Sequence, residues 1–85
     1  MRLIETSHFK QDYHKLPFAI QKRTNEKLGL LVQNLSHPSL RIKRVQKYKG
    51  VFEARITRDY RLFFQITREG YLLLRLGQHD IFEKG

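Results

Sequence analysis

The N-terminal part of the chain begins with a short strand-like segment and continues with apolar residues at helical spacing. The segment MRLIE is a strand candidate, and Thr6 or Ser7 behind it can cap the start of a helix. The apolar residues of that helix recur three or four positions apart: Phe9, Tyr13 and Leu16. Pro17 either ends this helix or begins the next one.

A second, longer helix is predicted over residues 18–35. Its apolar positions line one side of the helix: Ile20, Leu28, Leu31, Val32 and Leu35. The segment SHPS ends it, because Pro38 disfavours helical backbone in the residue before it. The two helices are therefore expected to form an antiparallel hairpin with one shared apolar face.

After Ser39 the hydrophobic pattern changes from the helical period to that of strands. LRIKRVQKYKG is predicted to be an edge strand and a loop, and VFEARIT, RLFFQIT and YLLLRLG are predicted strands. A strand, two helices and then three or four strands predict an α+β fold, with the helices on one face of a mainly antiparallel sheet. The length of 85 residues, without a linker or repeat, predicts one domain over residues 1–85.

Alternation within the strands predicts which residues share a face, because residues two apart point the same way. The fully apolar sets are expected under the helices: Phe52, Ala54, Ile56, Leu62, Phe64, Ile66, Leu72, Leu74 and Leu76. The opposite face then carries a mixed set: Glu53, Arg55, Arg61, Phe63, Gln65, Tyr71, Leu73 and Arg75.

Matching these faces predicts a strand register. The predicted pairs are Ile66 with Leu72, Phe64 with Leu74, Phe63 with Arg75, Arg61 with Gly77, Ile56 with Leu62 and Arg55 with Phe63. Residues 68–70 then form a three-residue loop that ends on Gly70, where a left-handed residue is wanted. A second odd loop, or a bulge, is expected at residues 58–60.

Three arginines converge in this register. Arg55 and Arg75 flank Phe63, and Arg61 lies diagonal to both, within reach of long side chains. Guanidinium groups this close repel one another unless an anion joins them, and Glu53 neutralises only one. The alternative is a surface ion pair of Glu53 with Arg75 or Arg55, which leaves the other charges in water.

The C-terminal tail adds a proton-transferring group. Continued alternation puts His79 on the arginine face, and histidine exchanges protons near neutral pH. Arginines hold a phosphate and stabilise the charge that grows in a transition state. These residue types together suit the cleavage of RNA by its own 2′-hydroxyl. The other histidines are scattered and lack the spacing of metal ligands: His8, His14 and His37.

Composition points to a polyanionic partner. The net charge is +9, and the basic residues between positions 41 and 61 face only Glu53 and Asp59. These basic residues are Arg41, Lys43, Arg44, Lys47, Lys49, Arg55, Arg58 and Arg61. The alternative is a basic surface that only confers solubility. The chain has no cysteine, no secretory signal pattern and no apolar run that would span a membrane, so a cytoplasmic protein is expected.

Two segments carry a resemblance to a known superfamily. The strand and helix order, the stretch FEARITRDYRLFFQI and the ending LRLGQHDIFEK resemble the RelE/ParE superfamily of bacterial toxin–antitoxin toxins over nearly the whole chain. RelE-like members are mRNA interferases that cut mRNA in the ribosomal A site through 2′-hydroxyl attack, without a metal or small-molecule cofactor. The resemblance therefore implies an endoribonuclease whose partners are the ribosome, mRNA and a cognate antitoxin protein.

The resemblance also implies roles for single residues. Arg55 and Arg61 resemble the basic residues of two central strands, His79 stands where the family has a basic residue or histidine, and Glu53 is a candidate general base. Phe82 stands near a position where relatives often have tyrosine. Phenylalanine can stack on a base but cannot donate a proton, so the acid role falls to His79.

RNA binding is expected at further basic positions, and two rival functions remain open. The expected RNA-binding residues are Lys43, Arg44, Lys47, Lys49, Arg75 and Phe82. ParE-like members share the fold, inhibit DNA gyrase and generally lack the catalytic set. A basic RNA-binding module without chemistry is the other rival.

Overall fold

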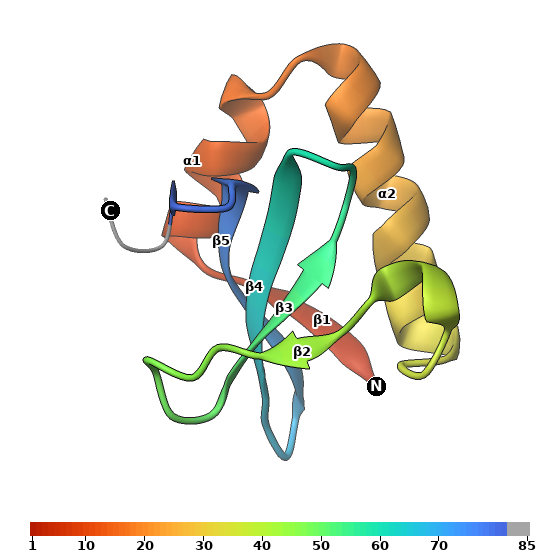
Figure 1. The fold of residues 1–85 in the computed structure, drawn as a ribbon, viewed down its shortest axis with the longest axis vertical. Coiled ribbons are helices and arrows are strands. Elements are labelled where there is room, and N and C mark those ends of the chain that lie inside the picture. The colour runs from red at the N-terminus through yellow and green to blue at the C-terminus, as the bar shows by residue number, and fades with distance from the viewer. Residues whose placement is uncertain (82–85) are drawn as a thin grey trace.

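The computed structural model describes residues 1–81 of the chain, so Phe82 and its expected contact with RNA lie outside the described residues. The helices and strands occur in the following order (Figure 1): β1 (Arg2–Glu5), α1 (Ser7–Lys15), α2 (Phe18–Gln33), the short 3-10 helix η1 (Pro38–Leu40), β2 (Lys43–Arg44), β3 (Val51–Arg55), β4 (Tyr60–Ile66) and β5 (Gly70–Gln78).

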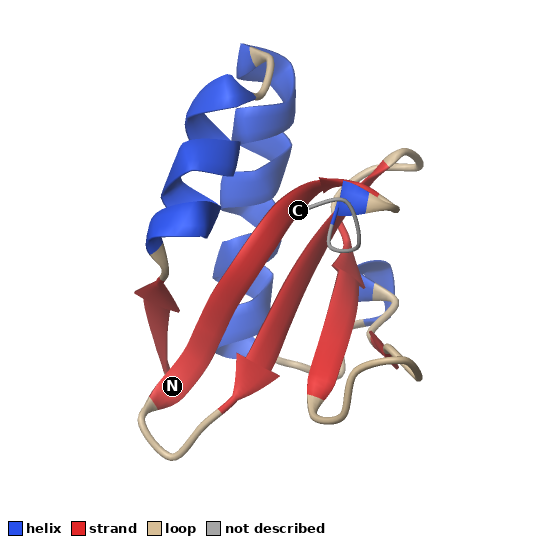
Figure 2. Ribbon diagram, turned by 90° about the vertical axis from the view of Figure 1, so that its left-hand side faces the viewer, coloured by secondary structure: helices blue, strands red, loops and turns tan. Residues whose placement is uncertain are grey.

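The strands form a five-stranded sheet in the order β1-β5-β4-β3-β2. β1 pairs with β5 in parallel, and all other neighbours are antiparallel. Figure 2 shows α1 and α2 on one side of this sheet. The predicted α+β fold, with a helical hairpin on one face of a mainly antiparallel sheet, is confirmed.

Local sequence signals determine where the helices begin and end. Thr6 is the N-cap of α1, because its Oγ1 accepts a hydrogen bond from the backbone N–H of Phe9 at 3.1 Å. Leu16 has extended backbone, as expected for the residue before Pro17, and α2 begins directly after that proline. α2 ends at Gln33, two residues before the predicted end.

The core lies between the helices and the sheet. Its buried members are Phe9, Leu28, Leu31, Leu40, Ala54, Ile56, Leu62, Phe64, Tyr71, Leu73 and Leu76. The inward orientation predicted for β3 and β4 is confirmed at Ala54, Leu62 and Phe64. Val32 and Ile66, which were expected to face inward, are exposed, since each lies near the end of its element.

The register between β3 and β4 differs from the prediction by two residues. Arg55 pairs with Arg61 and Glu53 pairs with Phe63, whereas the predicted partner of Arg55 was Phe63. A shift of two leaves every side chain on its predicted face, because the side-chain period of a strand is two. The β3–β4 turn lies one residue earlier than the predicted loop at residues 58–60, since both Ile56 and Thr57 donate to the carbonyl of Tyr60, and this produces the shift.

A β-bulge changes the orientation of the first half of β5. The predicted pairs of Phe63 with Arg75 and Arg61 with Gly77 are confirmed, but Phe64 pairs with Leu73. Leu74 is therefore the extra residue of the bulge. Because one inserted residue inverts the alternation, Tyr71 and Leu73 are buried in the core, and the prediction that Leu72 and Leu74 face inward is wrong.

The loop between β4 and β5 is one residue shorter than predicted, because Ile66 pairs with Tyr71 and not with Leu72. Thr67 Oγ1 accepts from the backbone N–H of Gly70 and donates to its carbonyl, so the side chain of Thr67 closes the turn. Gly70 has φ +156°, and a Cβ there would overlap the carbonyl oxygen of Arg2. Glycine is needed at this position because β1 approaches it closely.

Candidate nucleic-acid interface

The sheet face opposite the helices carries a pocket rich in cations. It has a volume of about 390 Å³, and we call it the basic pocket. Its lining residues come from the loop after η1 and from β2, β3 and β4: Arg41, Ile42, Lys43, Glu53, Arg55 and Arg61. Four basic side chains therefore surround one carboxylate. This imbalance favours binding of an anion with more than one charge.

Arg55 contributes a donor to this pocket that no group among the described residues accepts from. Its Nε is buried and makes no hydrogen bond within residues 1–81. Its Cα is paired with that of Arg61 on the neighbouring strand, so the two arginine side chains leave the same face of the sheet from adjacent positions. Burying an unpaired donor costs about 1–3 kcal/mol, and a ligand oxygen bound at Arg55 would remove that cost.

Arg61 is held in place by protein contacts. Its Nη1 donates to three carbonyls of the β3–β4 turn, those of Thr57 at 2.7 Å, Arg58 at 2.8 Å and Tyr60 at 3.1 Å. Its Nε lies 3.4 Å from Glu53 Oε2. The guanidinium is thereby fixed at the pocket wall before any ligand binds.

Among residues 1–81, Glu53 is the only acidic residue that lines the basic pocket, and its partners differ from those considered from the sequence. Its Oε2 lies 3.4 Å from Arg61 Nε and 3.9 Å from Lys43 Nζ. The pairs of Glu53 with Arg75 or Arg55, considered from the sequence, are not formed.

Arg41 was not predicted as a site residue, although its side chain lines the pocket. It follows η1 with φ 46° and ψ 51°, and among residues 1–81 it alone has positive φ without being glycine. This left-handed backbone costs an arginine about 1–3 kcal/mol. No local sequence signal identifies such a position, because the conformation results from the way η1 joins the edge strand β2.

Arg75 does not join Arg55 and Arg61, so the predicted cluster of three arginines is wrong in this respect. Its Nε donates to Asp12 Oδ2 at 2.7 Å and its Nη2 to Asp12 Oδ1 at 3.1 Å. These hydrogen bonds to Asp12 raise the pKa of Arg75 above its usual range. The carboxylate of α1 attracts the guanidinium towards the helix and away from the middle of the sheet.

The expected proton donor lies at the edge of the site. His79 is exposed in the turn that follows β5 and does not line the basic pocket. It leaves the sheet two residues after Gly77, which pairs with Arg61. His79 and the two pocket arginines are therefore at the same end of the sheet.

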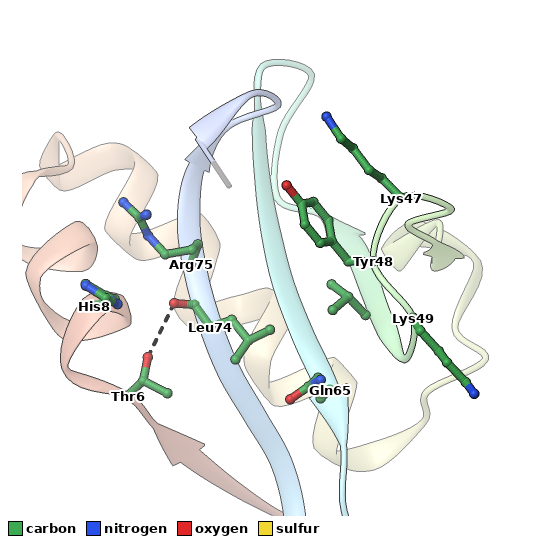
Figure 3. A pocket seen from close by; sticks show the side chains of 9 residues that line it. Thr6, His8, Lys47, Tyr48, Lys49, Gln65, Leu74 and Arg75 are labelled. Carbon is green, nitrogen blue, oxygen red and sulfur yellow. Dashed lines mark hydrogen bonds between the residues drawn. The ribbon is translucent and has the colours of Figure 1, made fainter. Parts of the chain in front are cut away.

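The expected RNA-binding residues are divided among three places. Lys43 lines the basic pocket, whereas Lys47, Lys49 and Arg75 line a second hollow on the same side of the sheet (Figure 3). Arg44 lies elsewhere, with its guanidinium carbon 5.4 Å from the ring centre of Phe52, which faces the core side. Lys43 and Arg44 are adjacent in β2, so alternation along the strand places their side chains on opposite faces of the sheet.

Two further properties concern metal binding and membranes. Within residues 1–81, no group of three histidine, aspartate or glutamate side chains is placed to hold a metal ion. In the same part of the chain, neither helix combines the length and the apolar character that crossing a bilayer requires.

Known structures share this fold. YafQ from E. coli strain BL21(DE3) is 18% identical, with 95% of this chain and 96% of that chain covered and a TM-score of 0.75. The YoeB/ParE toxin from Agrobacterium tumefaciens is 15% identical, with 93% and 99% covered and a TM-score of 0.78. The RelB–RelE antitoxin–toxin complex from Methanococcus jannaschii is 17% identical, with 94% of this chain and 94% of that chain covered and a TM-score of 0.75. Among curated protein sequences, none is significantly similar.

A protein-family model also matches most of the chain. The family model for the ParE toxin of the type II toxin–antitoxin system parDE matches residues 3–81. The chain therefore belongs to the ParE toxin family, within the RelE/ParE superfamily, and is a toxin of a type II toxin–antitoxin system. The resemblance seen in the sequence is confirmed.

Proposed function

We propose that this toxin is a ribosome-dependent endoribonuclease that cuts mRNA in the ribosomal A site. The observation that carries the proposal is the buried Nε of Arg55, which makes no hydrogen bond within residues 1–81 and belongs to a strand position paired with Arg61, in a pocket with four basic residues and one carboxylate. A phosphodiester presents two oxygens that such a pair can bind. The pocket is open on one side, which a polymeric substrate requires.

The proposed reaction transfers the phosphate within the RNA. Glu53 takes the proton of the 2′-hydroxyl, whose oxygen attacks the adjacent phosphorus, and the bond from phosphorus to the 5′-oxygen breaks. His79 gives a proton to that leaving oxygen. The products are a 2′,3′-cyclic phosphate and a 5′-hydroxyl. Arg55 and Arg61 stabilise the extra negative charge of the transition state. No cofactor takes part in this scheme.

Basic residues outside the reaction centre are proposed to bind the RNA backbone. Lys43 lies beside Glu53 in the basic pocket, and Lys47, Lys49 and Arg75 line the second hollow. Arg44 is exposed at the sheet edge and suits a contact with ribosomal RNA. Each bound phosphate releases counterions, which drives association.

A cognate antitoxin protein is the proposed protein partner. Structures with this fold include the DinJ–YafQ complex of E. coli and the YoeB–YefM complex of Staphylococcus aureus. The net charge of +9 predicts that the antitoxin presents an acidic or amphipathic segment to this toxin.

Inhibition of DNA gyrase is the second candidate function, because the matching family model is that of ParE. The contacts of Arg61 with the turn and the position of His79 outside the basic pocket also suit a site without chemistry. A basic RNA-binding module is the third possibility. The three functions differ in what happens to mRNA and DNA in the cell.

The test is induced expression followed by mapping of 5′ ends on cellular mRNA. We expect arrest of translation and new ends within codons at the A site for the natural protein, and none for Arg55→Gln. Arg23→Gln, a change of an exposed cation on α2, is the matched control and should cut normally. Intact mRNA together with gyrase-linked DNA breaks would instead identify a gyrase inhibitor. Arrest of translation with intact mRNA would identify a binding module.

A further inference from the structure

A second hollow lies beside the basic pocket and has a different character. It has a volume of about 510 Å³ and runs between the start of α1 and residues 47–49; we call it the side groove. Figure 3 shows His8 on one side and Tyr48 on the other, with Leu74 on the strand between them. Its volume is that of a small-molecule site.

The floor of the side groove exists because of the bulge in β5. The bulge turns Leu74 to the open face instead of the core. Thr6 Oγ1 donates to the carbonyl of Leu73 at 2.7 Å and lies 3.3 Å from that of Leu74, which holds the bulge in this shape. The groove is therefore already formed without a ligand.

The lining combines the groups that one nucleotide needs. Leu74 and the ring of Tyr48 offer apolar and aromatic surface for a base, and the amide of Gln65 offers a donor and an acceptor for its edge. His8 and the Asp12-paired Arg75 lie on one side of this centre, and the cations Lys47 and Lys49 lie on the other. Aromatic surface surrounded by cations is typical of sites that bind single-stranded nucleic acid.

The side groove and the basic pocket are neighbours on one face. Phe63 pairs with Glu53 on one side and with Arg75 on the other, so it lies between the two hollows. Glu53 and Arg75 are two strand spacings apart, about 10 Å. One continuous strand of RNA can therefore occupy both hollows.

We propose that the side groove binds one nucleotide of single-stranded RNA, next to the nucleotide whose phosphate occupies the basic pocket. Leu74, Tyr48 and Gln65 hold the base, and His8, Lys47 and Lys49 hold its phosphate. The groove thereby selects the base beside the cut. This inference rests on the proposed function, because it takes RNA as the substrate.

The test is a titration of the isotope-labelled protein, followed through its backbone amides by NMR. The ligands are 5′-AMP, 5′-UMP, inorganic phosphate and a 2′-O-methyl hexanucleotide, which cannot be cut. We expect the nucleotides and the hexanucleotide to shift the amides of Thr6, His8, Gln65 and Leu74. Inorganic phosphate should shift the amides of the phosphate-binding residues, namely Arg55 and Arg61 in the basic pocket and His8, Lys47 and Lys49 in the side groove. It should leave the amides of Gln65 and Leu74, which hold the base, unchanged.

Two variants make the test specific. Leu74→Ser and Gln65→Leu should each weaken hexanucleotide binding about fivefold or more, because each removes part of the base site. Both residues are half-buried on the open face, and an unchanged amide spectrum elsewhere shows that the fold is retained. Ile66→Ser, an apolar-to-polar change at an exposed position of β4 outside the groove, is the control and should bind normally.

The outcomes separate this inference from the proposed function. Nucleotide shifts in the side groove support the inference even if no mRNA is cut. Cleavage of mRNA by the Leu74→Ser and Gln65→Leu variants at the natural rate, with no nucleotide shift in the groove, overturns it while the proposed function stands. A groove that responds to an acidic peptide but to no nucleotide also overturns it.

Discussion

Asp12 of α1 and Arg75 of β5 form a two-pronged ion pair across 63 positions of the chain. The side chains of Asp12 and Arg75 are only 8% and 14% exposed, and Asp12 Oδ2 also accepts from the backbone N–H of Leu76 at 3.0 Å. β1 pairs with β5 only as far as Leu73, and beyond that point the Asp12 carboxylate accepts the backbone hydrogen bond of Leu76. The pair connects the first helix to the last strand and fixes one wall of the side groove.

Replacing Asp12 is expected to destabilise the fold strongly. Asp12→Ala leaves a buried guanidinium and a backbone N–H without partners, so the free energy of unfolding should fall by about 3 kcal/mol. Urea denaturation measures this. The control variant Glu26→Ala breaks the exposed ion pair of Glu26 with Arg23 and should change the free energy of unfolding by only about 0–1 kcal/mol. Equal effects of the two changes would contradict the structural role of Asp12.

The same pair should show no pH dependence from its arginine near neutrality. Hydrogen bonding to Asp12 raises the pKa of Arg75 in the folded protein, so the stabilising contribution of Arg75 is fully present at any pH below the pKa that arginine has in the unfolded chain. That contribution is lost only as the pH rises through the still higher folded pKa. Unfolding curves of the natural protein and of Arg75→Met at pH 7 and pH 9 should therefore differ by the same amount. A difference that shrinks between these values would be evidence against this reading.

Arg55 and Arg61 should separate activity from stability. Arg55→Gln is expected to abolish mRNA cleavage without lowering the free energy of unfolding, because Arg55 has no partner to lose within residues 1–81. Arg61→Gln should abolish cleavage and also lower the free energy of unfolding by about 1–2 kcal/mol, since the turn carbonyls lose a donor. Thermal unfolding beside the cleavage assay checks both. If Arg55→Gln lowered the free energy of unfolding more than Arg61→Gln does, the guanidinium of Arg55 would have a structural role.

Arg41 is expected to lower the stability of the fold and to strengthen RNA binding. Arg41→Gly removes the strain of the left-handed backbone and should raise the free energy of unfolding by up to about 1 kcal/mol. It also removes one cation from the basic pocket, so RNA binding should weaken. Arg41→Lys keeps both the charge and the strain and is the control. Should Arg41→Gly bind RNA as the natural protein does, Arg41 has no role in the pocket.

The salt dependence of RNA binding should reveal how many phosphates are bound. With three to five contacts, the slope of log affinity against log salt should be roughly −2 to −3.5 for a single strand. Arg55→Gln should reduce its magnitude by about 0.7. Fluorescence anisotropy with the uncleavable hexanucleotide measures this. A flat response would rule out a surface that binds mainly through phosphate.

The sequence predicts the elements well and the register less well. Thr6 as a cap, Pro17 as a boundary and the apolar spacing of both helices are local signals, and each is confirmed. Alternation also predicts the inward residues Ala54, Leu62 and Phe64 of β3 and β4, whereas Ile66 at the end of β4 is exposed. The bulge at Leu74 has no such signal, because the run YLLLRLG is apolar on both faces and fits either parity.

Some residues of the candidate site were predictable from the sequence and others were not. The basic residues of the open face were identified from alternation alone, since Arg55 and Arg61 lie on strands with one apolar side. Arg41, Asp12 and His8 were not, because their places depend on contacts between segments far apart in the chain. No local sequence pattern predicts that α1 places the Asp12 carboxylate beside Arg75 of β5.

The amino-acid sequence by itself determined the order of elements, the apolar face of the sheet and the excess of positive charge on the other face. These follow from hydrophobic periodicity and composition, which act along a single segment. Only the tertiary structure decided which cations remain without a partner. Asp12 neutralises Arg75 and the β3–β4 turn holds Arg61, whereas Arg55 is left free to bind an anion, because charge pairing depends on distances that only packing sets.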